Sequence, residues 1–176
     1  MLAVGGIDSG LYDAALFVHV MLVVVGVGSS FVWPALVTRA ARLDPAARAV
    51  TGRMVYDLSK LFTNLALFLA GIVGFGVAGF SKNPGNGELV FKPGQVWLDA
   101  SIGLWVVGVV LGFFVLQPAQ RRAAELAEQI ADEGDRRGAD VDTKLAATNK
   151  RIASVGGALQ LIVVVVLFLM IVKPGQ

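Results

Sequence analysis

Two ionisable side chains, His19 and Asp99, lie within long apolar stretches of this 176-residue sequence. Ionisable groups are costly to place in hydrocarbon, so in a membrane protein they indicate a functional site by default. Each residue lies a few positions from the same end of its predicted helix, which places the two side chains at similar depths. An imidazole can bind haem or a metal ion, and a neighbouring carboxylate can orient its ring. We therefore predict a cofactor-binding site that contains both residues.

Two methionines extend the same candidate site. Met21 lies within one turn of His19, and Met170 lies near the corresponding end of another apolar stretch. Thioether sulfur and imidazole nitrogen are ligands that suit Cu(I). The sequence thus predicts either haem b at His19 or copper held by His19, Met21 and Met170. Two other interpretations stay open: His19 bonds a neighbouring helix while Asp99 caps a helix N-terminus in water, or the pair relays protons.

Several other classes of chemistry are excluded by composition. The chain has no cysteine, which excludes disulfides, zinc–thiolate sites, iron–sulfur clusters and cysteine nucleophiles. It has one histidine, which excludes a His-rich metal site. Residues 119–150 contain six Lys and Arg against seven Asp and Glu, so no basic patch for nucleic acid is predicted.

Small residues spaced four apart predict close helix packing. Gly108 and Gly112 form one such pair, and Gly74 lies between Ala70 and Ala78. Small side chains let helix backbones approach in a bilayer, where no hydrophobic force drives helices together. We interpret the three glycines as packing positions, with a homodimer face or a gap for a flat cofactor as the alternative. Polar residues of the apolar stretches are predicted to bond between helices: Thr63, Asn64 and Gln160.

Four apolar segments position these residues. The chain is 56% hydrophobic and 16% charged, whereas an ordinary soluble domain has about 25% charged residues. A bilayer's hydrocarbon core requires about 20 apolar residues in a helix. The sequence therefore predicts an all-α polytopic membrane protein in which residues 1–176 form a single domain, a bundle of four transmembrane helices with cytoplasmic helical extensions. The predicted spans are 14–37, 61–80, 96–117 and 152–172.

The distribution of Lys and Arg predicts the orientation of the spans. The segments after the first and third spans carry twelve of the fifteen basic residues, and the other three lie in the remaining loop and the tail. Both termini are therefore predicted to lie outside a bacterial cytoplasmic (inner) membrane. Residues 1–13 contain no Lys or Arg, so we expect the first span to be retained and not cleaved as a signal peptide.

The connections between spans carry structure of their own. Asp44 followed by Pro45 is typical of a helix N-cap, and it predicts a short cytoplasmic helix before the second span. Residues 119–150 are predicted as a cytoplasmic helical hairpin, which continues the third helix to about Glu133 and turns at glycines. Pro-Gly turns in residues 81–95 predict a small hairpin on the outer face.

Three short motifs resemble those of a known family. The first span carries FVHV at 17–20, and the third begins with QVWL at 95–98 and ends with LQPAQRR at 116–122. Over residues 14–125 the chain resembles the CopD-like superfamily of four-helix membrane proteins, particularly its branch of predicted integral membrane proteins without an assigned function. The resemblance implies a four-helix bundle, with copper handling or haem binding as the activities of its better-known relatives.

The same resemblance bears on enzymatic activity. In the related haem-containing protoporphyrinogen oxidases, a His of the first helix and a Lys of the third are functionally required. His19 matches the His, whereas Ser101 stands at about the position of the Lys. The resemblance therefore implies the haem-binding position without the oxidase activity.

The residues and the resemblance together predict a small integral membrane protein of the CopD-like type. We expect a non-enzymatic or accessory subunit of a membrane complex, with a copper or haem site near the outer face. The alternatives are a haem-binding membrane oxidoreductase that uses His19 and a small transporter. No Pro pairs interrupt corresponding spans, which argues against the transporter. The expected partners are the lipid bilayer and other membrane chains, in a homo-oligomer or a larger complex.

Overall fold

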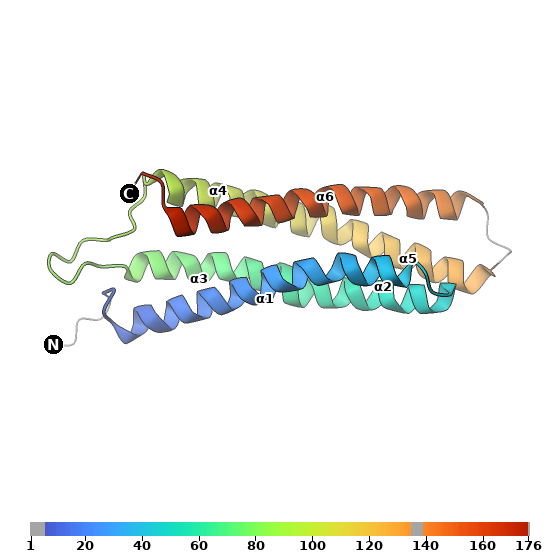
Figure 1. Cartoon of the computed structure of the whole chain (residues 1–176), viewed down its shortest axis with the longest axis horizontal. Helices are drawn as coiled ribbons and strands as arrows, with labels where there is room; N and C mark the ends of the chain where they lie inside the picture. The colour runs from blue at the N-terminus through green and yellow to red at the C-terminus, as the bar shows by residue number, and fades with distance from the viewer. Residues whose placement is uncertain (1–5, 135–138, 176) are drawn as a thin grey trace.

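The computed structural model describes residues 6–134 and 139–175, which form an elongated helical bundle (Figure 1). Four continuous helical rods run along the bundle, and each is long and apolar enough to cross a membrane. The predicted all-α fold with four membrane-spanning helices is therefore confirmed. The α-helices are α1 Gly10–Ala40, α2 Pro45–Ser59, α3 Ala66–Phe80, α4 Val96–Val110, α5 Gln117–Glu133 and α6 Ala139–Val172.

Two of the rods are each interrupted by a π-helical turn. The turn η1 (Lys60–Leu65) joins α2 to α3, and η2 (Leu111–Leu116) joins α4 to α5. Pro118 follows η2 and has no N–H to donate to the carbonyl of Phe114, and its ring crowds that oxygen. The helix therefore widens just before the proline. Such π turns are rare and are found frequently at functional sites.

The rods are arranged in two layers (Figure 1). In one layer α1 packs along α2 and α3, and in the other α6 packs antiparallel along α4 and α5. The layers meet where α2 packs against α5, whereas α3 and α4 touch over a much shorter stretch. The layers consequently separate toward the end of the bundle at which α1 begins and α6 ends. We call this end the terminal end.

Three segments meet at the terminal end. The backbone N–H of Ile7 donates to the carbonyl oxygen of Lys82 (3.0 Å), in the loop between α3 and α4. The ammonium of Lys173, which follows α6, lies 4.5 Å from the centre of the Phe91 ring in the same loop. The loop forms a small hairpin through an antiparallel bridge between Lys82 and Leu89, as its turn residues predict. Both ends of the described chain thus lie on the same side of the bundle.

The helix starts follow from local sequence. The side chain of Ser9 accepts a hydrogen bond from the backbone N–H of Tyr12 (3.3 Å) at the start of α1. Asp44 does the same for Ala47 (2.9 Å) at the start of α2, with Pro45 in the first turn. These side chains satisfy N–H groups that a helix leaves unpaired. The cap predicted at Asp44 is confirmed.

Cysteine labelling tests the predicted orientation, because the chain contains no cysteine. Pro84 is exposed in the loop at the terminal end, and Leu43 is exposed in the turn between α1 and α2. A membrane-impermeant maleimide added to intact cells should label Pro84→Cys, and it should label Leu43→Cys only after permeabilisation. The opposite labelling pattern would show that the predicted orientation is wrong. Ser81 would be a poor reporter because its side chain is fully buried.

Candidate functional site

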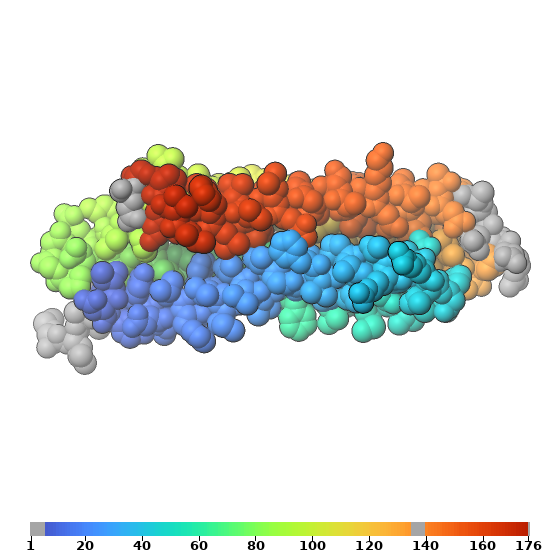
Figure 2. Space-filling model, viewed as in Figure 1, coloured from blue at the N-terminus to red at the C-terminus, as the bar shows by residue number. Residues whose placement is uncertain are grey.

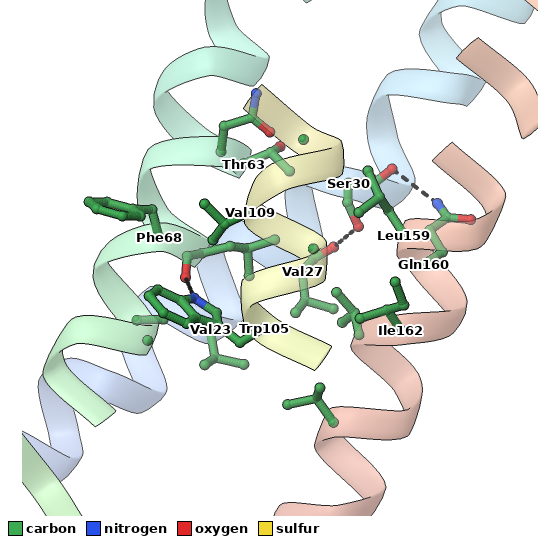
Figure 3. A pocket seen from close by; sticks show the side chains of 18 of the residues that line it. Val23, Val27, Ser30, Thr63, Phe68, Trp105, Val109, Leu159, Gln160 and Ile162 are labelled. Atoms are coloured by element: carbon green, nitrogen blue, oxygen red, sulfur yellow. Dashed lines mark hydrogen bonds between the residues drawn. The ribbon is translucent and has the colours of Figure 1, made fainter. Parts of the chain in front are cut away.

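A cavity of 1430 Å³ separates the two helical layers. It exceeds the roughly 300–1,000 Å³ of typical ligand pockets, and its walls are mainly aliphatic and aromatic. Figure 2 shows the surface hollowed between α1 and α6 toward the terminal end, and Figure 3 shows side chains from its middle part. Cofactors of helical bundles bind in such interiors. Eight of the lining residues are glycines, and they come from all rods but α1: Gly52, Gly71, Gly74, Gly79, Gly108, Gly112, Gly156 and Gly157.

His19 lies on α1 and lines this cavity. Its Nδ1 lies 2.8 Å from the carbonyl oxygen of Ala70 on α3, so the interpretation that His19 bonds a neighbouring helix is confirmed. A carbonyl oxygen only accepts, so Nδ1 carries the hydrogen, and Nε2 of the neutral ring keeps its lone pair. Within the described residues the hydrogen bond of the His19 ring is made through Nδ1 and not through Nε2. The ring is therefore held in the tautomer that can bind a metal through Nε2.

The predicted packing glycines have different neighbours. A Cβ built at Gly74 would lie 3.1 Å from Cε1 of His19 and 3.3 Å from its Nδ1, so Gly74 makes room for the imidazole. Gly108 faces side chains of α6, whereas a Cβ at Gly112 would lie 3.6 Å from Oδ1 of Asn64. Gly108 and Gly112 are four residues apart, but they face two different rods of the bundle.

Trp105 packs between α4 and α3 as a second ring placed against a glycine, a contact that the sequence does not predict. A Cβ built at Gly71 would lie 2.0 Å from Cε2 of Trp105, so the indole rests directly on the α3 backbone. Its Nε1 donates to the carbonyl oxygen of Leu67 (3.1 Å), and the ring stacks on Phe68 at 6.1 Å (Figure 3). The available signal was the spacing of Gly71 and Gly74, which places both on one face of α3.

The remaining predicted site residues are not all brought together. Asp99 lies in the first turn of α4, where its exposed carboxylate accepts a hydrogen bond from the backbone N–H of Gly94 (3.1 Å). Asp99 and Met170 line the cavity with His19, whereas Met21 is 45% exposed and does not line it. Across residues 6–134 and 139–175, no three His, Cys, Asp or Glu side chains cluster as metal ligands would.

A cluster of polar side chains lies near the middle of the cavity. Nε1 of Trp33 donates to Oγ1 of Thr63 (2.7 Å), which also lies 2.7 Å from Oγ of Ser29. Nε2 of Gln160 donates to the carbonyl oxygen of Ser30 (3.2 Å) and joins α6 to α1 (Figure 3). The interhelical bonds predicted for Thr63 and Gln160 are confirmed.

Two buried donors in the cavity wall lack acceptors. Nδ2 of Asn64 and Nε1 of Trp97 are buried, and neither has a hydrogen-bond partner in the part of the chain that the structure describes. Buried polar groups are nearly always paired. Trp97 lies at the terminal end, where the ammonium of Lys173 is 5.6 Å from its ring centre. The cavity therefore presents two unpaired donors in its wall and a cation at its mouth.

Comparison with known proteins matches residues 14–174 to a family described as "Predicted integral membrane protein (DUF2269)". No curated protein and no solved structure matches the chain. The matched region contains almost the whole bundle, including the cavity-lining residues of all four rods.

Proposed function

The chain belongs to the DUF2269 family of predicted integral membrane proteins, and within it we propose that this chain holds haem b in its interhelical cavity through His19. In this proposal it is a non-enzymatic or accessory subunit of a membrane complex, of the CopD-like type that its motifs resemble. It resides in the bacterial inner membrane with both termini outside, so that His19 lies nearer the outer face.

The orientation of His19 carries the proposal. The bond from Nδ1 to the Ala70 carbonyl fixes the ring and leaves Nε2 as the ligating nitrogen, and Gly74 provides the space that this arrangement needs. A ligating histidine usually donates its other ring N–H to a carbonyl or carboxylate. The contact thus supplies the support expected of a histidine that would ligate a metal through Nε2.

The cavity around His19 has the chemistry that haem requires. Its walls are apolar, which suits the porphyrin, and Lys173 at the mouth can pair with the haem carboxylates. Met170 lines the same cavity, and its thioether would be a further group able to ligate the iron. When bound, haem supplies one-electron transfer. The protein residues bind it, orient it and keep water away from it.

Haem is favoured over copper because the three predicted copper ligands do not all line the cavity. Met21 lies exposed outside the cavity, which leaves His19 and Met170 as the imidazole and thioether within it. Copper remains the second candidate, since His19 and Met170 line the same apolar cavity. Elemental analysis of the purified chain separates the two, because copper and iron are counted independently.

Two observations support a non-enzymatic subunit over an oxidase. Ser101, which stands where the related oxidases carry a required Lys, is buried and donates to the carbonyl oxygen of Trp97 (2.7 Å). It therefore brings no positive charge to the cavity. The apolar part of α6 is nowhere buried within the described chain, so it can contact lipid or another membrane chain.

Titration of haemin into the detergent-purified chain tests the proposal. We expect a Soret band that saturates with the wild-type chain and a haem affinity at least about tenfold lower in His19→Ala, because the axial ligand is gone. Phe17→Ala is the matched control, since Phe17 lies on the same helix but is 66% exposed. Equal haem affinity of His19→Ala and Phe17→Ala would refute His19 as the ligand.

A further inference from the structure

We infer that a second site in the cavity, at Asn64, binds an apolar molecule through a carbonyl acceptor, and that a membrane quinone is its occupant. Asn64 precedes Ala70, the residue that His19 contacts, by six positions, which is about 9 Å along the rod at the usual helical rise. The inference rests on Asn64 and is independent of haem binding at His19.

Asn64 presents a donor that the protein does not use. Its side chain lines the cavity and is 9% exposed, and its Nδ2 has no acceptor among the described residues. The neighbouring hydroxyl of Thr63 is already engaged by Trp33 and Ser29. On the facing rod, a Cβ built at Gly112 would lie 3.6 Å from Oδ1 of Asn64, and Gly112 has no side chain to offer. Pairing this donor therefore requires an acceptor that the described part of the chain does not supply.

The backbone around Asn64 is also unusual. Asn64 lies in the π turn η1, and Gly112 opposite it lies in the π turn η2. Two facing π turns, a glycine and an unpaired amide thus occur at one level of the bundle. Simple helix packing requires none of these, whereas π turns inside α-helices frequently mark binding sites.

An apolar molecule can reach this level from the bilayer. The surface is hollowed between α1 and α6 toward the terminal end, which gives an apolar molecule a way into the cavity (Figure 2). The bond from Gln160 to the Ser30 carbonyl ties the same two helices together. Because α6 runs antiparallel to α4 and Gly108 faces Leu159, Gly156 lies near the level of Gly112. A Cβ at Gly156 would meet nothing within 4 Å, so this part of the wall is open.

The unpaired groups and the lining residues define the class of occupant. The two buried atoms without partners, Nδ2 of Asn64 and Nε1 of Trp97, are both donors, so an occupant that pairs with them must supply acceptors. Carbonyls on apolar bodies occur in membrane quinones and in the esters of glycerolipids. The charged residues among those lining the cavity are Arg48, Asp99 and Lys173, which lie toward its ends and not beside Asn64. A neutral molecule without a charged headgroup is therefore favoured, and a quinone ring is flat enough for a gap lined by glycines.

Titration of decylubiquinone into the full-length chain in detergent tests this site, with quenching of tryptophan fluorescence as the readout. We expect Asn64→Leu to weaken binding by about tenfold, the equivalent of about 1.4 kcal/mol, because the donor is lost at similar size. Asn149→Leu is the matched control, since it makes the same substitution elsewhere in the cavity wall. Asn64→Leu should not lower the melting temperature of the unliganded chain, because an unpaired buried amide is removed.

Further variants separate this site from the haem site and from lipid binding. His19→Ala should bind decylubiquinone as the wild type does, whereas Gly156→Phe should abolish binding by filling the cavity at the level of Asn64. Equal affinity of Asn64→Leu and the wild type, or loss of binding in His19→Ala, would overturn the site. Binding of dioctanoylglycerol that depends on Asn64, without binding of decylubiquinone, would overturn the quinone as occupant.

Discussion

Replacing Gly71 with alanine will destabilise the bundle by about 2 kcal/mol. The added Cβ would lie 2.0 Å from Cε2 of Trp105 and 2.2 Å from its Nε1, so the indole must move. Overpacking of this kind costs about 1–3 kcal/mol, and loss of the bond to the Leu67 carbonyl adds about 1 kcal/mol. The higher helix propensity of alanine offsets about 1 kcal/mol of this loss of stability. Thermal unfolding in detergent, followed by tryptophan fluorescence, measures the difference.

Gly103→Ala is the control for this prediction. A Cβ at Gly103 meets nothing within 4 Å, so the same substitution should leave the melting temperature unchanged or raise it. Trp105→Leu should reduce the penalty of Gly71→Ala in a double-mutant cycle, because the two positions interact directly. Equal melting temperatures for Gly71→Ala and Gly103→Ala would contradict the placement of Trp105.

Replacing Gly74 with leucine will weaken haem binding at least about tenfold while His19 is retained, a loss of about 1.4 kcal/mol or more. A Cβ at this position already crowds Cε1 of His19 at 3.1 Å, and the rest of the leucine must enter the space of the imidazole. The bond from Nδ1 to the Ala70 carbonyl is then lost, so Nε2 is no longer oriented. Haemin titration followed at the Soret band measures the effect.

Gly76→Leu is the matched control on the same helix. A Cβ at Gly76 would meet only the Phe80 ring, at an ordinary 3.8 Å, and Gly76 does not line the cavity. Its haem affinity should therefore equal that of the wild type. If Gly74→Leu bound haem as tightly as Gly76→Leu, the role of Gly74 in positioning His19 would be wrong.

The helices of this fold are predictable from sequence because the bilayer imposes strong rules on composition. Apolar segments of sufficient length identify the four spans, and Asp44 with Pro45 identifies the start of α2. His19 is found by the same reasoning, since a lone imidazole in an apolar segment is conspicuous. These features depend on residue type and position along the chain alone.

The geometry between helices is not predictable in the same way. Each span is apolar around its whole circumference, so no stripe of polar residues shows which face turns inward. This is why Met21 was expected beside His19 but lies on the exposed side of α1, and why the contact of Gly71 with Trp105 was missed. The π turn η1 is also not predictable from a proline, whereas η2 is followed by Pro118.

The most direct test of the haem proposal is the absorption spectrum of the chain purified, without added haem, from membranes of haem-replete cells. We predict a haem b spectrum for the wild type and for Phe17→Ala, and its loss in His19→Ala at equal protein yield. A wild-type chain without haem, or a His19→Ala chain that keeps the wild-type spectrum, would contradict the haem proposal.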